Sequence, residues 1–260
     1  MTTNLRKVAL VTGAAKRIGK SIALAFAARG WDVIVHYGRS ADAAIETVEA
    51  ILALGQRAHA LACDLADASA VRALVPQAVA WCGADSRLCC VVNNASLFEY
   101  DVVADFSVTL LDRHMHINLA APLLLAQALH QATPAGAQAV VVNLLDQKLF
   151  NLNPDFLSYT LSKCALHSAI PMLAMALAPT VRVVGVAPGL TLISNLQTSD
   201  EFAAAHTLSP LGESSQPDEV ADAVVFAAEN RALNGSTILV DAGQHLLPLA
   251  RDFSFIKRTS

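Results

Sequence analysis

The stretch VALVTGAAKRIG, residues 8–19, decides the fold of this chain. Val8–Thr12 is a short apolar run typical of a buried strand, and residues with helical spacing follow at Lys16–Ala28. Gly13 ends the strand, and the small residues beside it let another molecule approach the backbone closely. A helix that begins directly after such a turn offers free N–H groups to a pyrophosphate. Placed between a first strand and a first helix, the turn predicts a dinucleotide site rather than an ordinary glycine turn.

The alternation of strand and helix that starts there continues along the chain. Apolar runs predict strands at Val8–Thr12, Trp31–His36, Ala58–Cys63, Leu88–Asn93, Ala139–Leu145, Val181–Ala187 and Thr237–Val240. Helical spacing predicts helices at Lys16–Ala28, Ala41–Leu54, Ser69–Trp81, Leu110–Gln131, Phe156–Ala178 and Pro217–Glu229. The predicted fold class is therefore α/β: a Rossmann-type doubly wound parallel sheet in three layers, as a single domain over residues 1–260.

Two strands show why a parallel sheet is expected. Val33–Val35 and Val140–Val142 are apolar at every position, as strands buried between two helix layers must be. Ligands of such a sheet bind beyond the carboxyl ends of its strands. The residues that directly follow each strand are therefore the candidates for function.

Composition narrows the class of protein. The chain has 260 residues, of which 54% are hydrophobic and 15% charged, and this excludes a disordered protein. Eighteen basic and 22 acidic residues give a net charge of −4, which argues against nucleic acid and against an anionic membrane as partners. The five cysteines show no CxxC spacing, so we expect no metal, no disulfide framework and a reduced, cytoplasmic setting.

No targeting or membrane-spanning segment is expected from the sequence. Residues 1–7 lack the pattern of a charged segment, an apolar core and a cleavage site. The longest apolar stretch, Ala165–Val181, contains Pro171 and is too short to span a membrane. We expect a buried helix, kinked at Pro171, which a second subunit could also cover.

The second strand is followed by a basic loop. In the sequence His36-Tyr37-Gly38-Arg39-Ser40, no acid is present to bind the 2′-hydroxyl of an adenosine ribose. Arg39 and Ser40 instead offer a cation and a hydroxyl to a 2′-phosphate. With the preceding glycine turn, this loop favours NADP over NAD, although a lone loop arginine could simply be solvated.

The third and fourth strands end in polar residues. Asp64, followed by Leu65, can accept a hydrogen bond from the adenine amino group. The run that follows the fourth strand, Asn93-Asn94-Ala95-Ser96, suits a strand end, because asparagine side chains bond to loop backbone. For each of these polar residues an ordinary turn is the alternative.

The candidate chemistry lies in three residues that follow the fifth strand in the sequence. Asp146 follows the strand, and Tyr159 and Lys163 are four apart, so they share one face of a predicted helix. A nearby ammonium group favours tyrosinate, so we expect Lys163 to lower the pKa of Tyr159 toward neutrality. Tyr159 would then act as a general acid in the reduction of a carbonyl or an imine.

These motifs together resemble the short-chain dehydrogenase/reductase family. The resemblance covers nearly the whole chain, from TGAAKRIG through the aspartate and NNA elements to Val240-Asp241-Ala242-Gly243. It implies that Asn118 holds a water behind Lys163 and that Lys163 reaches the nicotinamide ribose. It adds Ile18, Asn93, Ala95, Pro188, Gly189 and Thr191 to the cofactor-binding residues, beside Gly13, His36, Tyr37, Leu65, Tyr159 and Lys163.

Two positions depart from the family pattern. Arg17 stands where the middle glycine of the first motif is usual, and Asp146 stands where the family normally has serine. Together with HYGRS at residues 36–40, NNAS at 93–96 and Phe98, they are similar to the pteridine reductase and dihydromonapterin reductase branch. That branch implies an NADPH-dependent reductase whose pterin stacks between nicotinamide and Phe98.

The branch also implies the substrate contacts and the assembly. Arg17, Ser96, Asp146 and Tyr159 would contact the pterin, with Arg17 and Ser96 at its polar edge or at the cofactor phosphates. Residues 190–215 would cover the substrate, although they carry no clear pterin signature. A homo-oligomer, dimer or tetramer, is expected.

Two other functions stay open at this point. The same chemistry on another substrate, such as a 3-oxoacyl thioester, a steroid or a sugar ketone, is possible, although Asp146 and Arg17 count against it. A catalytically silent NADP sensor is also possible. A sensor would not need the set of Asn118, Tyr159 and Lys163, which argues against that function.

Overall fold

The computed structural model describes residues 5–194 and 196–255, and a single parallel sheet lies at its centre. The strand order is β3-β2-β1-β4-β5-β6-β7, and every pair is parallel. The bounds are β1 Arg6–Val11, β2 Asp32–Tyr37, β3 Ala58–Ala62, β4 Ser86–Asn93, β5 Ala139–Leu144, β6 Val181–Pro188 and β7 Thr237–Val240. The strand order reverses direction between β1 and β4, so the predicted doubly wound α/β fold is confirmed.

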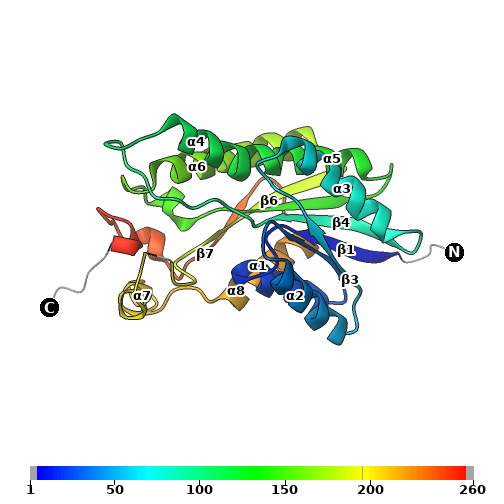
Figure 1. Ribbon diagram of the computed structural model, residues 1–260, viewed down its shortest axis with the longest axis horizontal. Coiled ribbons are helices and arrows are strands. Elements are labelled where there is room, and N and C mark those ends of the chain that lie inside the picture. The colour runs from blue at the N-terminus through cyan, green and yellow to red at the C-terminus, as the bar shows by residue number, and fades with distance from the viewer. Residues whose placement is uncertain (1–4, 195, 256–260) are drawn as a thin grey trace.

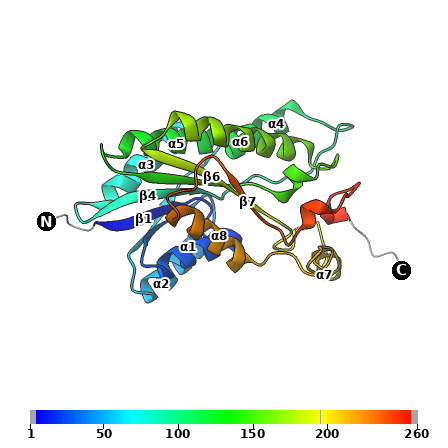
Figure 2. The same ribbon diagram turned by 180° about the vertical axis from the view of Figure 1, so that it is seen from behind.

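Helices cover both faces of this sheet (Figures 1 and 2). One layer holds α1 Arg17–Ala28, α2 Ala41–Ala53 and α8 Pro217–Glu229. The other holds α3 Ala68–Cys82, α4 Val108–Met115, α5 Ala121–Ala132 and α6 Leu157–Ala176. The short helix α7, Ser199–His206, and the C-terminal segment lie together beyond the carboxyl ends of β6 and β7 (Figure 1).

The strands are apolar on both faces because each face meets its own core. In β2, Val33 and Val35 pack in the core under α1, α2 and α8, whereas Ile34 packs in the opposite core. Alternate side chains of a strand point to opposite faces, so a doubly covered strand needs an apolar residue at every position. This packing confirms the interpretation drawn from the valine runs.

The helix predicted as continuous over Leu110–Gln131 is interrupted. Between α4 and α5 the chain forms one π-helical turn, His116–Ala120. Pro122 has no N–H, so it cannot donate to the carbonyl of Asn118 as the α-helical pattern requires. A π-turn accommodates this break and leaves the side chain of Asn118 buried.

Helix α6 continues through Pro171 for 20 residues, so the proline does not end it. Among the helices of the described chain, none is long and apolar enough to cross a membrane. One stripe of α6, formed by Leu161, Met172 and Met175, stays exposed.

Candidate active site

A cavity of about 860 Å³ opens at the carboxyl ends of the central strands. A smaller pocket of about 180 Å³ adjoins it and reaches Lys163 and Pro188. The residues predicted from sequence that line the larger cavity are Gly13, Arg17, Ile18, Ala95, Ser96, Phe98, Asp146, Tyr159, Gly189 and Thr191. Segments far apart in sequence thus meet at one site, as the doubly wound fold requires.

The glycine turn after β1 rests on a buried histidine. The N–H of Gly13, whose φ is +64°, donates to Nδ1 of His36 at 3.0 Å, and Nε2 of His36 donates to the carbonyl of Cys63 at 3.1 Å. Burial lowers the pKa of His36 to about 4, so the ring is neutral and can accept the Gly13 bond. His36 therefore supports the turn from below, and its part in cofactor binding is indirect.

Asn94 locks the end of β4 to the end of β1. Its side-chain amide donates to the carbonyl of Thr12 at 2.8 Å, while the Thr12 hydroxyl accepts from the N–H groups of Asn94 and Ala95. Asn94 also lines the cavity. Asn93, predicted as a cofactor residue, is buried instead and donates to Asn143 of β5 at 2.7 Å.

Arg17 begins α1 in a backbone conformation that usually requires glycine. Its φ is +56°, in the left-handed region that costs an L side chain about 1–2 kcal/mol. The exposed side chain crosses to the loop after β6, where its Nη2 donates to the carbonyl of Ile193 at 2.9 Å. Arg17 thus touches both the glycine turn and the loop expected to cover the substrate.

The loops after β2 and β3 continue the line of strand ends beside the cavity. Arg39 is exposed, and Ser40 directly precedes α2, with a hydroxyl that makes no capping bond within the described chain. Asp64 accepts from the N–H of Ala66 at 2.9 Å, and Leu65 is buried in the core. The strand order β3-β2-β1 sets these loops in a row, as an extended dinucleotide needs.

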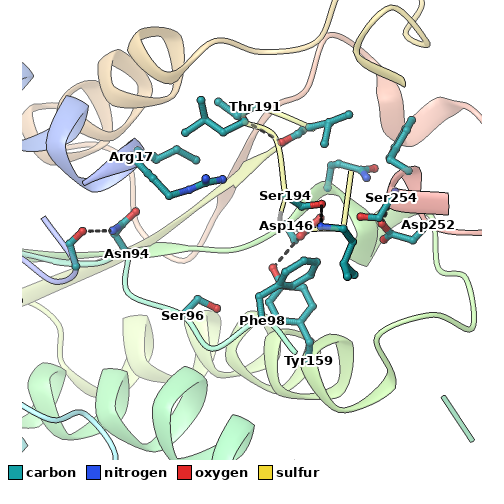
Figure 3. A pocket seen from close by; sticks show the side chains of 18 of the residues that line it. Arg17, Asn94, Ser96, Phe98, Asp146, Tyr159, Thr191, Ser194, Asp252 and Ser254 are labelled. Carbon is teal, nitrogen blue, oxygen red and sulfur yellow. Dashed lines mark hydrogen bonds between the residues drawn. The ribbon is translucent and has the colours of Figure 1, made fainter. Parts of the chain in front are cut away.

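The half-buried Asp146 and the buried Tyr159 form the centre of the site (Figure 3). The Tyr159 hydroxyl donates to Oδ2 of Asp146 at 2.8 Å, and the N–H of Lys148 donates to Oδ1 at 2.8 Å. Burial raises the pKa of Asp146 above its usual value, and these two bonds only partly oppose that effect. The carboxyl is therefore fixed in place and is a weaker acid than an exposed aspartate.

The expectation that Lys163 lowers the pKa of Tyr159 is wrong. Burial raises the pKa of Tyr159 well above its usual value, and the charge of Asp146 and its hydrogen bond add to this. The Nζ of Lys163 lies 5.9 Å from the centre of the tyrosine ring and donates to the carbonyl of Leu144 at 2.7 Å. Burial lowers the pKa of Lys163 itself to about 8.

Asn118 fastens the loop after β4. Its Oδ1 accepts from the N–H of Leu97 at 2.8 Å, and its Nδ2 donates to the carbonyl of Leu97 at 3.0 Å. The same Nδ2 donates to the Ser162 hydroxyl on α6, and Oδ1 also accepts from Ser96. The side chain is thereby committed to positioning the loop that carries Ser96.

Phe98 supplies an aromatic surface to the cavity. Its side chain is 42% exposed, stacks on Phe156 with ring centres 4.2 Å apart, and meets Tyr159 edge-on at 4.7 Å. The ring is thus held against Tyr159 and presents an aromatic face on which a flat molecule could stack.

Comparison with known proteins is consistent with this geometry. Residues 7–203 match the family described as short chain dehydrogenase. The chain belongs to the short chain dehydrogenase family. Among relatives, it is 34% identical to an uncharacterized oxidoreductase of Methylorubrum extorquens, over 91% of this chain and 97% of that protein. It is also 30% identical to an L-rhamnose 1-dehydrogenase (NAD(P)(+)) of a Sphingomonas species, over 92% of this chain and 96% of the relative.

Solved structures of other short chain dehydrogenases share the whole fold. FolM alternative dihydrofolate reductase 1 from Brucella canis, complexed with NADP, is 39% identical and has a TM-score of 0.88 over 95% of this chain and 96% of that one. A short chain dehydrogenase from Burkholderia cenocepacia in complex with NADP is 30% identical, with a TM-score of 0.84 over 94% and 99% of the two chains. This membership makes the chain an oxidoreductase.

The sequence interpretation missed one wall of this short chain dehydrogenase site. Asp252, Phe253 and Ser254, close to the C-terminus, line the cavity together with Tyr100. No motif marks these residues in the sequence. A hydrogen bond from Lys148 helps to hold this segment at the cavity, and Lys148 lies 104 positions before Asp252 in the chain. No local sequence pattern reveals such a long-range pairing.

Proposed function

We propose that this short chain dehydrogenase uses NADPH to reduce a C=N bond of a pteridine, such as a dihydropterin or dihydrofolate. The observation that carries the proposal is the 2.8 Å hydrogen bond from Tyr159 to Asp146, which stands at the position where the family normally has serine. The Brucella reductases, named as alternative dihydrofolate reductases, support the same substrate class at 39% identity.

The cofactor is NADP, as in the complexes of the related structures. The glycine turn at Gly13 and the start of α1 would hold the pyrophosphate, with Arg17 beside it. Arg39 and the hydroxyl of Ser40 would bind the 2′-phosphate, since no acid follows β2. Bound in this way, NADPH supplies the hydride.

The chain's own residues supply the proton. The high pKa of Tyr159 keeps its hydroxyl protonated near neutral pH, and the hydroxyl donates its proton to the ring nitrogen as the adjacent carbon receives the hydride. With a pKa of about 8, Lys163 is mainly charged at pH 7 and stabilises the resulting tyrosinate. The buried carboxyl of Asp146 orients the tyrosine hydroxyl and can pass a proton back to it.

The same carboxylate disfavours a simple ketone as substrate. Ketone reduction develops negative charge on oxygen, which a neighbouring carboxylate repels, whereas serine would donate a hydrogen bond to it. Reduction of C=N develops no such oxyanion. The alternative function, reduction of a carbonyl compound as in the 3-oxoacyl-[acyl-carrier-protein] reductase relatives, therefore fits Asp146 less well.

A turnover assay tests the proposal. NADPH oxidation would be followed with dihydropterins, dihydrofolate, an acetoacetyl thioester and a sugar substrate, each at matched concentration. We expect the highest kcat/KM with a dihydropterin or dihydrofolate. Turnover of carbonyl compounds alone would establish the alternative, and NADPH binding without turnover of any compound would identify a sensor.

A further inference from the structure

The C-terminal segment, Arg251–Phe255, forms one wall of the active-site cavity. It lies beyond the carboxyl ends of the strands, against the turn that follows β5 (Figure 1). Asp252 and Ser254 lie on the opposite side of the cavity from Arg17, with Asp146 and Tyr159 between them (Figure 3). The cavity thus has the Arg17 guanidinium at one end and the Asp252 carboxylate at the other, with the Asp146 carboxyl between them.

Two ion pairs fix this segment in place. Nζ of Lys148 lies 2.9 Å from Oδ2 of Asp252, and Nε of Arg251 lies 2.8 Å from Oδ2 of Asp155. The same Asp155 oxygen accepts from the N–H of Asp252 at 2.8 Å. Both the backbone and the side chain of Asp252 are therefore held in one position.

Lys148 is itself held from several sides. Its side chain is only 3% exposed, its Nζ donates to the carbonyl of Asp155 at 2.7 Å, and it lies 5.3 Å from the centre of the Phe156 ring. The desolvation of such a buried ion pair can cost as much free energy as the pairing returns, so stability alone does not account for this pair. Lys148 also donates its N–H to Asp146, so this one residue positions both carboxylates.

Counting partners among the residues that the structure describes, Asp252 keeps acceptor positions free for a ligand. Its Oδ1 accepts from the N–H of Ser254 at 3.0 Å, and its Oδ2 accepts from Lys148. A carboxylate offers about four lone-pair positions, so one remains on each oxygen. The side chain is 14% exposed and lines the cavity. Its charge adds to burial in raising the pKa values of Asp146 and Tyr159, as expected for a close neighbour.

We propose that Asp252 binds the N–H edge of an amino-substituted heteroaromatic substrate and that Lys148 is the positioning residue that holds it there. The inference rests on the proposed function and assigns the ring's orientation. A 2-amino-4-oxopyrimidine ring presents an amino group beside a ring N–H, and these two parallel donors match the two oxygens of a carboxylate. Tyr159 then faces the other ring, where the proton is needed.

The test compares two substrates that differ at one position. Dihydropterin carries the 2-amino group, whereas dihydrolumazine carries an oxygen there, which would face the Asp252 carboxylate. KM and the dissociation constant for each would be measured with wild type and Asp252→Asn. We expect Asp252→Asn to weaken dihydropterin binding about 10- to 100-fold, the effect of one charge-assisted hydrogen bond, with a smaller change in kcat. Its preference for dihydropterin should disappear.

Controls separate this role from a structural one. Asp85→Asn changes an exposed aspartate at the opposite end of β4 and should leave both substrates unaffected. Lys148→Met alone should weaken dihydropterin binding. In a double variant with Asp252→Asn, it should weaken binding little further than Asp252→Asn does alone. Both site variants should retain the NADPH affinity of wild type. The preference is the ratio of the values for dihydropterin and dihydrolumazine, measured on the same protein sample. A lower folded fraction therefore does not change this ratio.

The outcomes distinguish the two proposals. A wild-type protein that neither binds nor reduces dihydropterin overturns the proposed function, and the assignment of Asp252 falls with it. A wild-type protein that reduces dihydropterin, with an unchanged preference in Asp252→Asn, overturns the assignment of Asp252 alone.

Discussion

At the scale of single residues, the proposed chemistry depends on Asp146. A carboxylate that accepts from Tyr159 suits proton delivery to nitrogen, and serine would suit a ketone oxygen. We expect Asp146→Ala to lose most pterin reduction, and Asp146→Ser to keep the fold and gain turnover of simple ketones. Turnover and melting temperature would be measured together. A variant that is less stable yet fully active per folded molecule would show that Asp146 only caps the turn after β5.

Variants of Tyr159 and Lys163 should distinguish a role in turnover alone from a role in both turnover and NADPH binding. Tyr159→Phe removes only the hydroxyl, so we expect turnover to disappear while the NADPH dissociation constant stays nearly unchanged. Lys163→Ala removes a buried cation and should impair both. Stopped-flow turnover and fluorescence titration with NADPH would measure the two effects, and substantial activity in Tyr159→Phe would assign proton transfer to another group.

Arg39 should set the choice of cofactor. A charge-assisted bond to the 2′-phosphate contributes about 1.5–3 kcal/mol. Arg39→Ala should therefore reduce the ratio of the affinities for NADPH and NADH by about 10- to 100-fold. Arg72→Ala, which changes an exposed arginine on α3, serves as the control. Equal affinity of the wild-type protein for both cofactors would contradict the assignment.

At the scale of elements, the turn between β1 and α1 should be sensitive to acid. His36 has a pKa of about 4 in the folded chain and 6.5 when unperturbed, so between these values the unfolded chain binds more protons. Stability should therefore fall as pH drops from 6.5 to 4, by about 3 kcal/mol in the limit of full titration. His36→Gln keeps an acceptor and a donor without titrating, so its unfolding free energy should depend less on pH. Equal pH dependence in chemical denaturation would argue against this origin.

The elements also show what the sequence could and could not reveal. The succession of strands and helices along the chain and the line of site residues follow from local patterns, such as the all-apolar run Val33–Val35 and the glycine turn at Gly13. The π-turn at Asn118 lies next to Pro122, whose missing N–H disfavours an unbroken α-helix, and hydrophobic spacing does not register such a break. The high pKa of Tyr159 depends on burial, which a motif cannot measure.

At the scale of the whole molecule, one surface is left apolar. Met172 and Met175 on α6 are 65% and 75% exposed, and Leu161 lies on the same stripe. Such a stripe is typical of a subunit interface, so we propose that the chain forms a dimer or tetramer through α6. Met175→Glu should lower the mass measured by light scattering without changing the helical content. A wild-type monomer would contradict this.

The bond between Arg17 and the carbonyl of Ile193 gives the molecule a further property. With Arg17 beside the cofactor phosphates, as proposed, one guanidinium contacts both the nucleotide site and the loop expected to cover the substrate. Linkage between two sites is reciprocal. Under the proposed assignment, nucleotide in the phosphate site should raise the affinity for substrate, and bound substrate should raise the affinity for the nucleotide by the same factor.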